Sequence, residues 1–499
     1  MLKSLGAAAK RHPDVPLDYA IEYGERMAEP GFYFMDSPGN DLESVAGQVA
    51  SGCNMIFFVT GNGSITNFPF VPTIKFVTTT ERFQLLAEDM DINAGAYLDG
   101  TPMPELGAAT LDYTIAVASG QRSVGEKAGH AQVQIWRDWA LNSPLKSQPV
   151  VVPPASGKPV SIAPAEDIPS VRIPVVRNGE HVTTERVGLV LPTSLCSGQI
   201  ARMCVETLNK SPRLAGGSIS RYVTLVHTEG CGSSLNDEFR DTLLGYLSHP
   251  FVAHALLLEH GCESTHNDYF RQALRARGLD PQGFGWASIQ LDGGIQNVVR
   301  KMIGWFEQQL EHEEPPETGE AGLEAVRLGL VTHGVPTPYT AQTLAVLTRM
   351  IVSVGGTVIA AEQESLLKSE YFHQLGVADD VYPTLSYASL ANAPGFHLMA
   401  MPTRDWGEIL TGLGAGSVNI IIGLTEHQPM PGHPLIPVLR VGENGSRELD
   451  VRLEGEAHVA ARHLLHSILQ TLSHHYQPQA VRSGNVYFQI TRGLLGVSL

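Results

Sequence analysis

Two short stretches of the chain concentrate side chains that can bind a metal ion or move a proton. The first is HTEGCG, residues 227–232, and the second is HGCE, residues 260–263. Thiolate, imidazole and carboxylate groups together can hold zinc, iron or manganese, and the adjacent glycines would let the loops fold around an ion. A cysteine is also a common small core residue, and neither spacing is a standard zinc pattern, so both readings stay open. The candidate groups are His227, Cys231, His260, Cys262, Glu263 and His266.

A second polar set lies in the first hundred residues, where short apolar runs end. The apolar run 32–35 is followed by Asp36 and Ser37, and the run 55–60 is followed by Gly-Asn-Gly-Ser at 61–64. Ligands of open α/β sheets bind at the carboxyl ends of strands, and glycines there let backbone N–H groups approach an anion. Helix capping and turn formation are the structural alternative for Asp and Ser. Their combination in one block predicts substrate binding by Asp36, Ser37, Asn62, Ser64, Lys75, Asp91 and Asn93.

Two of the charged candidates stand in or beside apolar runs, where an uncompensated charge is expensive. Glu362 closes the run 357–361, so it is either a ligand or base at the wet end of a strand or the first residue of a loop. Lys75 lies inside the run 73–77 and must reach a sheet edge, a partner or an anion. A surface position is the alternative for Lys75.

The elements that must position these residues alternate between strands and helices. In the front part we expect strands at 32–35, 55–60 and 73–77, with a helix that ends near Gly52. From residue 187 onward the expected order is strand 187–191, helix 193–208, strand 222–227, helix 239–247, strand 255–258, strand 326–331, helix 339–354 and strand 357–361. This alternation predicts an α/β protein with parallel or mixed sheets, crossover helices and several Rossmann-like subdomains. The loop at 61–64 is neither a Walker loop nor a dinucleotide fingerprint, so no nucleotide cofactor is indicated.

Composition narrows the function classes. The 499 residues carry a formal net charge of −17, with a pI near 5.5, which argues against a nucleic-acid surface. No uninterrupted apolar window of 18 residues and no signal-peptide profile occurs, so we expect no membrane partner and a cytoplasmic location. Five cysteines at unrelated spacings suit reduced thiols rather than a disulfide framework.

Longer motifs resemble one enzyme family. PGFYFMDSPG at 30–39, FVTGNGS at 58–64, VPTIK at 71–75 and MDINAG at 90–95 look like the C-terminal half of the altronate/galactarate dehydratase family. VGLVLPTSLCSGQIAR at 187–202, HTEGCG, HGCE and GGTVIAAE at 355–362 resemble its N-terminal catalytic half, although the family's Cys-Gly-Gly-Ser-Asp-like turn is replaced by THGVP at 332–336. The resemblance implies removal of water from a sugar acid to give a 2-keto-3-deoxy acid, usually with a divalent metal. It leads us to expect Fe, Mn, Mg or Zn, with Cys231, Cys262 and Glu263 as candidate ligands.

The order of these motifs predicts four segments. Residues 1–141 form a dehydratase C-terminal-type α/β domain, 142–184 a proline-rich linker, 185–390 an N-terminal-half-type α/β domain, and 391–499 a degenerate repeat of the first domain. The repeat is carried by PGFHLM at 394–399 and IPVLR at 436–440. Its polar loops differ, since Ala400-Met401 replaces Asp36-Ser37, and no counterpart of residues 90–93 is expected. We also expect no counterpart of the family's small N-terminal β-domain.

The leading hypothesis is therefore a hydro-lyase of an aldonate or aldarate. We expect His227 or Glu362 to transfer the proton in a β-elimination, while the loops at Asp36 and Ser64 recognise hydroxyl and carboxylate groups. The alternatives are a non-catalytic or half-site subunit of a dehydratase complex and a sugar-acid binding protein. A homo-oligomer, or a partner subunit that supplies a missing loop, is expected. The cysteine-bearing loops could also meet the 61–64 and 90–93 loops in one composite site, within the chain or across a dimer.

Overall fold

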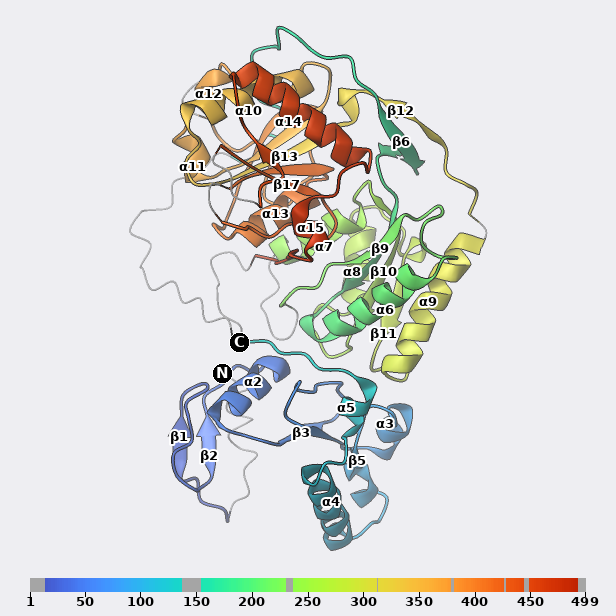
Figure 1. Ribbon diagram of the computed structural model, residues 1–499. Helices are drawn as coiled ribbons and strands as arrows, with labels where there is room; N and C mark the ends of the chain where they lie inside the picture. The colour runs from blue at the N-terminus through green and yellow to red at the C-terminus, as the bar shows by residue number, and fades with distance from the viewer. Residues whose placement is uncertain are drawn as a thin grey trace.

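The computed structural model describes residues 14–136, 154–229, 237–311, 313–377, 381–425, 428–443 and 448–491. Three parts follow one another along the chain in Figure 1, and we call them the front block (residues 14–136), the middle domain (185–311) and the last domain (323–491). Within these described residues, no helix has both the length and the apolar character needed to cross a bilayer.

The front block contains two small parallel sheets, one formed by β1 and β2 and the other by β3, β4 and β5. Helix α2 begins where the Asn40 side chain accepts a hydrogen bond from the backbone N–H of Leu42, and it ends at Gly52, whose φ of 116° favours glycine. The elements are β1 (Tyr19–Ile21), β2 (Tyr33–Met35), α2 (Asp41–Ser51), β3 (Ile56–Thr60), β4 (Thr73–Val77), α3 (Thr80–Leu85), β5 (Ile92–Asn93), η1 (Ala94–Tyr97), α4 (Met103–Ala118) and α5 (Val124–Ala128).

The middle domain is a four-stranded parallel sheet in the order β11, β10, β8, β9, flanked by helices. Every residue of β8 is buried, as expected for a central strand whose two faces are covered. The elements are β8 (Val187–Pro192), η2 (Leu195–Ser197), α6 (Gly198–Lys210), β9 (Arg221–Thr224), α7 (Asp237–Leu247), β10 (Val252–Glu259), α8 (Asn267–Ala276), η3 (Pro281–Gly283), β11 (Gly285–Ser288) and α9 (Ile295–Glu311).

The last domain is a six-stranded parallel sheet in the order β15, β14, β13, β16, β17, β18. The domain boundary expected after residue 390 falls inside this sheet, because β13 and β14 pair with β16 and β15. The elements are η4 (Leu323–Ala325), β13 (Arg327–His333), α10 (Pro338–Val352), β14 (Thr357–Ala361), α11 (Glu364–Leu367), α12 (Tyr371–Gln374), β15 (Gly395–Met399), α13 (Trp406–Ala415), β16 (Ile420–Thr425), β17 (Val438–Gly442), β18 (Val451–Arg452), α14 (Ala457–Leu472) and α15 (Gln479–Arg482). The predicted α/β class is confirmed.

A small antiparallel sheet occupies part of the expected linker. Strand β6 (Ile173–Asn178) pairs with β7 (His181–Thr183) and with β12 (Thr318–Ala321), which follows the middle domain. Strand β6 is the central strand, but Pro174 lies opposite Glu320 of β12 and outside the part of β6 that pairs with β7, so the chain has a neighbour on one side only at this proline. The described part of the linker, residues 154–184, is thus partly strand; the proline-rich residues 142–153 lie outside the described residues.

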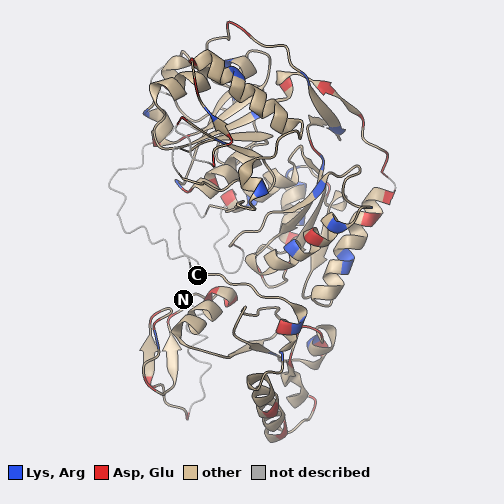
Figure 2. Ribbon diagram, viewed as in Figure 1, with Lys and Arg blue, Asp and Glu red and all other residues tan. Residues whose placement is uncertain are grey.

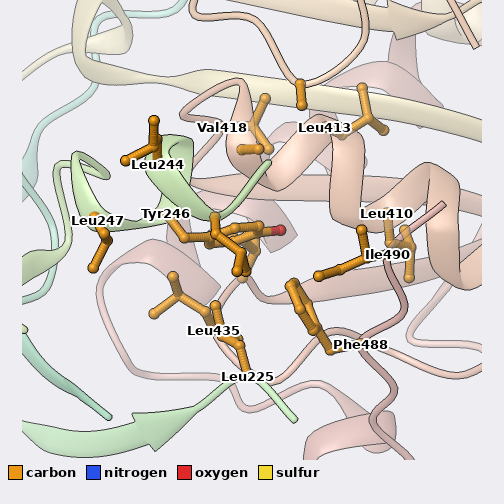
Figure 3. Packing of buried hydrophobic residues seen from close by; sticks show 14 of the residues in the cluster. Leu225, Leu244, Tyr246, Leu247, Leu410, Leu413, Val418, Leu435, Phe488 and Ile490 are labelled. Carbon is orange, nitrogen blue, oxygen red and sulfur yellow. The ribbon is translucent and has the colours of Figure 1, made fainter. Parts of the chain in front are cut away.

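The middle and last domains share one hydrophobic core. Tyr246 of α7 is buried among Leu410 and Leu413 of α13 and Phe488 and Ile490 near the end of the described chain (Figure 3). Its hydroxyl donates a 2.8 Å hydrogen bond to the carbonyl oxygen of Thr411. A second core fills the other face of the six-stranded sheet, beneath α10 and α14.

The front block and the last domain contain one matching hydrogen-bond arrangement. The backbone N–H of Lys75 in β4 donates to Asp91 at 2.9 Å, and that of Arg440 in β17 donates to Asp450 at 2.8 Å. Each aspartate also accepts a tyrosine hydroxyl at 2.7 Å, from Tyr113 and Tyr476 respectively. Asp450 thus makes the same two kinds of hydrogen bond as Asp91, although residues 449–452 share only this aspartate with residues 90–93.

Candidate functional site

The polar loops of the front block meet those of the middle domain within one chain. Gln290 donates from Nε2 to the carbonyl oxygen of Gly63 at 2.6 Å, and the backbone N–H of Ile295 donates to Asp89 Oδ2 at 2.9 Å. On the other side of the junction, the Gln132 side chain donates to the carbonyl oxygen of Leu195 at 2.6 Å. The glycine loop at 61–64 therefore meets the middle domain within one chain, while a composite site shared with the cysteine-bearing loops stays a prediction.

These loops leave the carboxyl ends of their strands, where open α/β sheets hold ligands. The glycine loop follows β3, and Asn93 closes β5. In the middle domain, the loop at 193–197 follows β8, the loop at 260–263 follows β10, and Ser288 closes β11. Loops at the carboxyl ends of strands from two separate parallel sheets therefore meet at one junction.

Glu263 is held as a buried carboxylate in the middle domain. Its Oε1 accepts hydrogen bonds from Thr193 Oγ1 at 2.8 Å and from the backbone N–H of His260 at 2.9 Å. Its Oε2 accepts the backbone N–H of Gly261 at 2.7 Å. Burial alone would raise the pKa of Glu263, but the charge of His260 and the backbone donors more than offset it, so the pKa is lowered.

Beside this carboxylate lie two groups of metal-ligating type. His260 Nδ1 is 3.2 Å from Cys262 Sγ, and the ligand atoms of His260, Cys262 and Glu263 all lie within 4.8 Å of one another. Nitrogen, sulfur and oxygen donors in one cluster suit a borderline-soft divalent ion such as zinc or iron. Two of the three predicted metal ligands belong to this cluster; Cys231 lies outside the described residues.

The front block contributes two buried basic side chains without hydrogen-bond partners in the described part of the chain. They are Lys75, at Nζ, and His130, at both ring nitrogens. Burial lowers the pKa of Lys75, against the opposing charges of Asp91 and Asp89. The pKa of His130 is lowered to about 3 by burial and by the charges of Lys75 and His260. His130, Lys75 and the metal-type cluster therefore share one electrostatic environment.

Further buried polar atoms at this junction also lack a partner within the described residues. A buried polar group without a hydrogen bond costs about 1–3 kcal/mol unless a ligand or water satisfies it. The atoms belong to front-block and middle-domain residues, namely Asn67 Oδ1, Thr73 Oγ1, Asn93 Oδ1, Gln132 Oε1, Ser194 Oγ, His260 Nε2 and Ser288 Oγ. The arrangement can therefore hold a ligand that offers both donors and acceptors.

A cavity of about 360 Å³ adjoins the same loops on the middle-domain side. Gly261 and Ser288 line it, together with the cations of Arg271 and Lys301. Arg271 also lies 4.4 Å from the centre of the Trp286 ring, which holds its side chain in place. Both cations are paired with carboxylates that line the same cavity, Arg271 with Asp268 at 2.6 Å and Lys301 with Asp292 at 2.8 Å, so the cavity wall carries both charges.

Other predicted residues lie elsewhere or have partners. Both ring nitrogens of His227 are engaged, since Nε2 donates to the carbonyl oxygen of Pro192 at 2.9 Å and Nδ1 accepts from the backbone of Glu229 at 3.2 Å. Glu362 follows β14 in the last domain, in a different sheet from the junction loops, and burial raises its pKa.

Some of the remaining substrate-binding candidates are buried and hydrogen-bonded, and others are exposed. Ser64 is buried and bonded to Thr66 at 2.9 Å, whereas Asn62 is exposed. Asp36 is exposed after β2, and Ser37 donates to the carbonyl oxygen of Pro38 at 3.0 Å. Lys75, Asp91 and Asn93 lie in or beside β4 and β5. His130 and Asp89 were missed, because no spacing rule marks a single histidine or aspartate in a loop.

Comparisons with known proteins agree with the motifs. The family model described as D-galactarate/Altronate dehydratase, C-terminal, matches residues 1–141, and the model described as D-galactarate dehydratase/Altronate hydrolase, second domain, matches residues 176–313. Together they cover more than half of the 499 residues.

Similar curated proteins include altronate dehydratase of Escherichia coli (strain K12), 32% identical over 135 residues, and altronate dehydratase of Bacillus subtilis (strain 168), 33% identical over 136 residues. Each alignment covers 27% of this chain and 27% of the relative. The (2R)-sulfolactate sulfo-lyase subunit beta of Chromohalobacter salexigens is 28% identical over 136 residues, which is 27% of this chain and 35% of that protein. The chain thus spans about a quarter to a third of the length of these relatives. On the two family models and the motifs at the junction, the chain belongs to the altronate/galactarate dehydratase family.

Proposed function

We propose that the chain is a hydro-lyase that removes water from a sugar acid, an aldonate or aldarate, at the junction between the front block and the middle domain. The observation that carries this proposal is the fully buried amine of Lys75, which has no hydrogen-bond partner among the described residues and whose charge, like that of His260, acts on the buried His130. Family membership supports the same reaction class, since the relatives named above include altronate dehydratases.

Lys75 is the residue that we propose as the base. Its lowered pKa favours a neutral amine, which can accept the proton from the carbon next to the substrate carboxylate. The resulting ammonium can return that proton to the 3-hydroxyl as it leaves, so that water and an enol form and the enol rearranges to the 2-keto acid. Neutral His130 offers one donor and one acceptor to the substrate hydroxyls. Proton transfer by His227 or Glu362 stays a prediction.

The donor set of His260, Cys262 and Glu263 fits a divalent metal, and we propose that these residues hold it. When bound, the ion would supply a Lewis acid that draws electron density from the carboxylate and 2-hydroxyl of the substrate. A cytoplasmic location also stays a prediction.

We also propose that the front block and the last domain are two copies of one unit and that the chain works with a further polypeptide. The matching bonds of Asp91 and Asp450 support the first point. For the second, one relative is named as the beta subunit of a lyase.

The test is turnover of a panel of aldonic and aldaric acids with Mg, Mn, Fe or Zn, followed as 2-keto-3-deoxy product. Lys75→Met should lower kcat/KM by about 10²–10⁴ because it removes the base. Lys127→Met, an exposed lysine in α5 of the same block, should leave kcat/KM unchanged. The proposal fails if no acid is turned over by the reduced, metal-supplied protein, or if Lys75→Met retains full activity.

A further inference from the structure

Another cavity, of about 920 Å³, lies between the middle domain, the last domain and the small sheet of β6, β7 and β12. Its walls include Ser248, just before β10, and Arg327 and Thr357, which begin β13 and β14. The His260 cluster follows the other end of β10, and a strand of eight residues is about 25 Å long. The cavity is therefore separate from the junction at which we place the reaction.

Arg327 supplies a positive charge to this cavity without a carboxylate partner among the described residues. Its Nε donates to the carbonyl oxygen of Ser417 at 2.7 Å, and its Nη2 donates to that of Ala391 at 3.1 Å and to that of Gly416 at 3.5 Å. These bonds leave Nη1 for a ligand. Burial lowers the pKa of Arg327, but a guanidinium stays protonated in proteins. The two other arginines of the cavity wall each pair with a carboxylate, Arg177 with Glu317 at 3.0 Å and Arg277 with Asp241 at 2.8 Å.

Two hydroxyl groups lie beside the guanidinium. Thr357 is directly opposite Arg327 in the pairing of β14 with β13, and paired residues of parallel strands point to the same face of the sheet. Ser417 is adjacent, because its carbonyl oxygen accepts the hydrogen bond from Arg327 Nε. Both residues line the cavity, and neither hydroxyl has a hydrogen-bond partner within the described residues. One charged and two neutral donors are thus gathered at one place.

The backbone of Ser417 supports a binding role for its hydroxyl. Its φ is 67°, in the left-handed region that favours glycine. Among the described residues, only Ala388 and His474 are further non-glycine residues with a positive φ. Such strained conformations cluster at sites that hold ligands. A serine provides a donor here that the less strained glycine would lack.

The outer wall of the cavity offers hydrogen-bond acceptors and apolar contacts. Glu320 of β12 and Asn392 are exposed and can accept hydrogen bonds from hydroxyl groups. Val182 and Leu390 are apolar side chains that remain 52% and 36% exposed. Figure 2 shows residues of both charges on the small sheet that contains β6 and β12. The wall away from Arg327 therefore fits the uncharged, hydroxyl-bearing part of a molecule.

We propose that this cavity binds a small hydroxycarboxylate, whose carboxylate group lies against Arg327, Thr357 and Ser417. One cation without a counter-charge matches a single negative charge. A phosphate would bring a second negative charge towards the carbonyl oxygens at the end of α13, which already surround Arg327. Because a ligand here touches both domains, it would stabilise their arrangement from a place remote from the junction. The proposal does not depend on the dehydratase chemistry.

The test is calorimetric titration of the full chain with D-gluconate, combined with hydrogen exchange. We expect gluconate to protect residues 325–327, 355–358 and 416–419. Thr357→Val should weaken binding about tenfold, because one hydrogen bond to a carboxylate is lost. Ser417→Gly should weaken it to a similar degree without lowering Tm, since glycine adopts a φ of 67° readily. Ala388→Gly is the control, because Ala388 also has a positive φ but does not line the cavity, and it should bind gluconate as the wild type does.

Three results would overturn the proposal. One is the absence of protection in these segments at saturating gluconate, and another is protection that Thr357→Val and Ser417→Gly both leave unchanged. The third is tighter binding of inorganic phosphate or of acetate than of gluconate, since the site would then recognise a dianion or a carboxylate alone. Gluconate bound at the junction would instead protect residues 62–64 and 260–263 and respond to Lys75→Met, so this test stays separate from that of the proposed function.

Discussion

The side-chain amide of Gln290 donates a 2.6 Å hydrogen bond to the carbonyl oxygen of Gly63, and so joins the middle domain to the glycine loop of the front block. Gln290→Met keeps the volume but leaves the Gly63 carbonyl without this donor. We expect the free energy of unfolding to fall by about 1–3 kcal/mol, and hydrogen exchange to accelerate in the front block more than in the last domain. Gln282→Met, at an exposed position of η3, is the control. Uniform exchange across both parts would contradict the bridging role.

Lys75 is expected to lower stability in return for its function. Burial outweighs the attraction of Asp91 and Asp89, so the folded state disfavours the ammonium. Lys75→Met should therefore raise the free energy of unfolding at pH 7.5 by about 1–3 kcal/mol, as measured by urea denaturation, while activity is lost. For Lys127→Met, an exposed change, we expect less than about 0.5 kcal/mol. A destabilised Lys75→Met would mean that the amine has a partner in the folded protein.

Two buried histidines between the middle and last domains predict an acid-sensitive fold. Burial and nearby positive charge lower the pKa of His249 to about 4 and that of His433 to about 3. Between these values and the ordinary pKa near 6.5 the unfolded chain binds more protons than the folded one, so stability falls as the pH falls.

The free energy of unfolding should fall by about 1.4 kcal/mol per pH unit for each histidine as the pH is lowered from roughly 6 to 4.5. It is measured by urea denaturation across that window. His433→Gln should lower this slope by the contribution of one histidine, about 1.4 kcal/mol per pH unit. His463→Gln, at an exposed position of α14, should leave the slope unchanged. Carboxylates such as Glu185, whose pKa is lowered mainly by the opposing Arg221 despite burial, affect stability only at lower pH. A flat profile from pH 7 to 5 would exclude the histidine mechanism.

Metal binding at the His260 cluster should appear as a shift in Tm. A metal present at 100 times its Kd stabilises the folded state by about 2.7 kcal/mol. Cys262→Ser replaces a soft ligand and should abolish the Tm rise seen with zinc or iron, and a chelator should reverse that rise in the wild type. Cys53→Ser, a free cysteine in the front block, should retain the shift. An equal shift in both variants would locate the ion elsewhere.

The sequence predicts the alternation of strands and helices well, because apolar runs such as 187–192 and 357–361 are short, buried and bounded by turns. It misses the sheet that unites residues 327–361 with 395–452, since strand neighbours are set by tertiary packing. The sequence singles out Lys75, Cys262 and Glu263, on which the proposed site depends, and their roles stay predictions. The sequence does not indicate His130. It lies far from His260 along the chain, so no local spacing of residues relates the two.

The core around Tyr246 also affects the order in which parts of the protein unfold. Residues of the middle and last domains share that core, whereas the front block contacts the middle domain mainly through hydrogen bonds of its loops and a few apolar contacts. The two domains should consequently melt as a single cooperative unit, and the front block should detach at a lower free energy, before any global unfolding. The proposed site would then have one wall fixed by this core and one wall held mainly by loops, so that local detachment of the front block would expose it to solvent while the core stays folded.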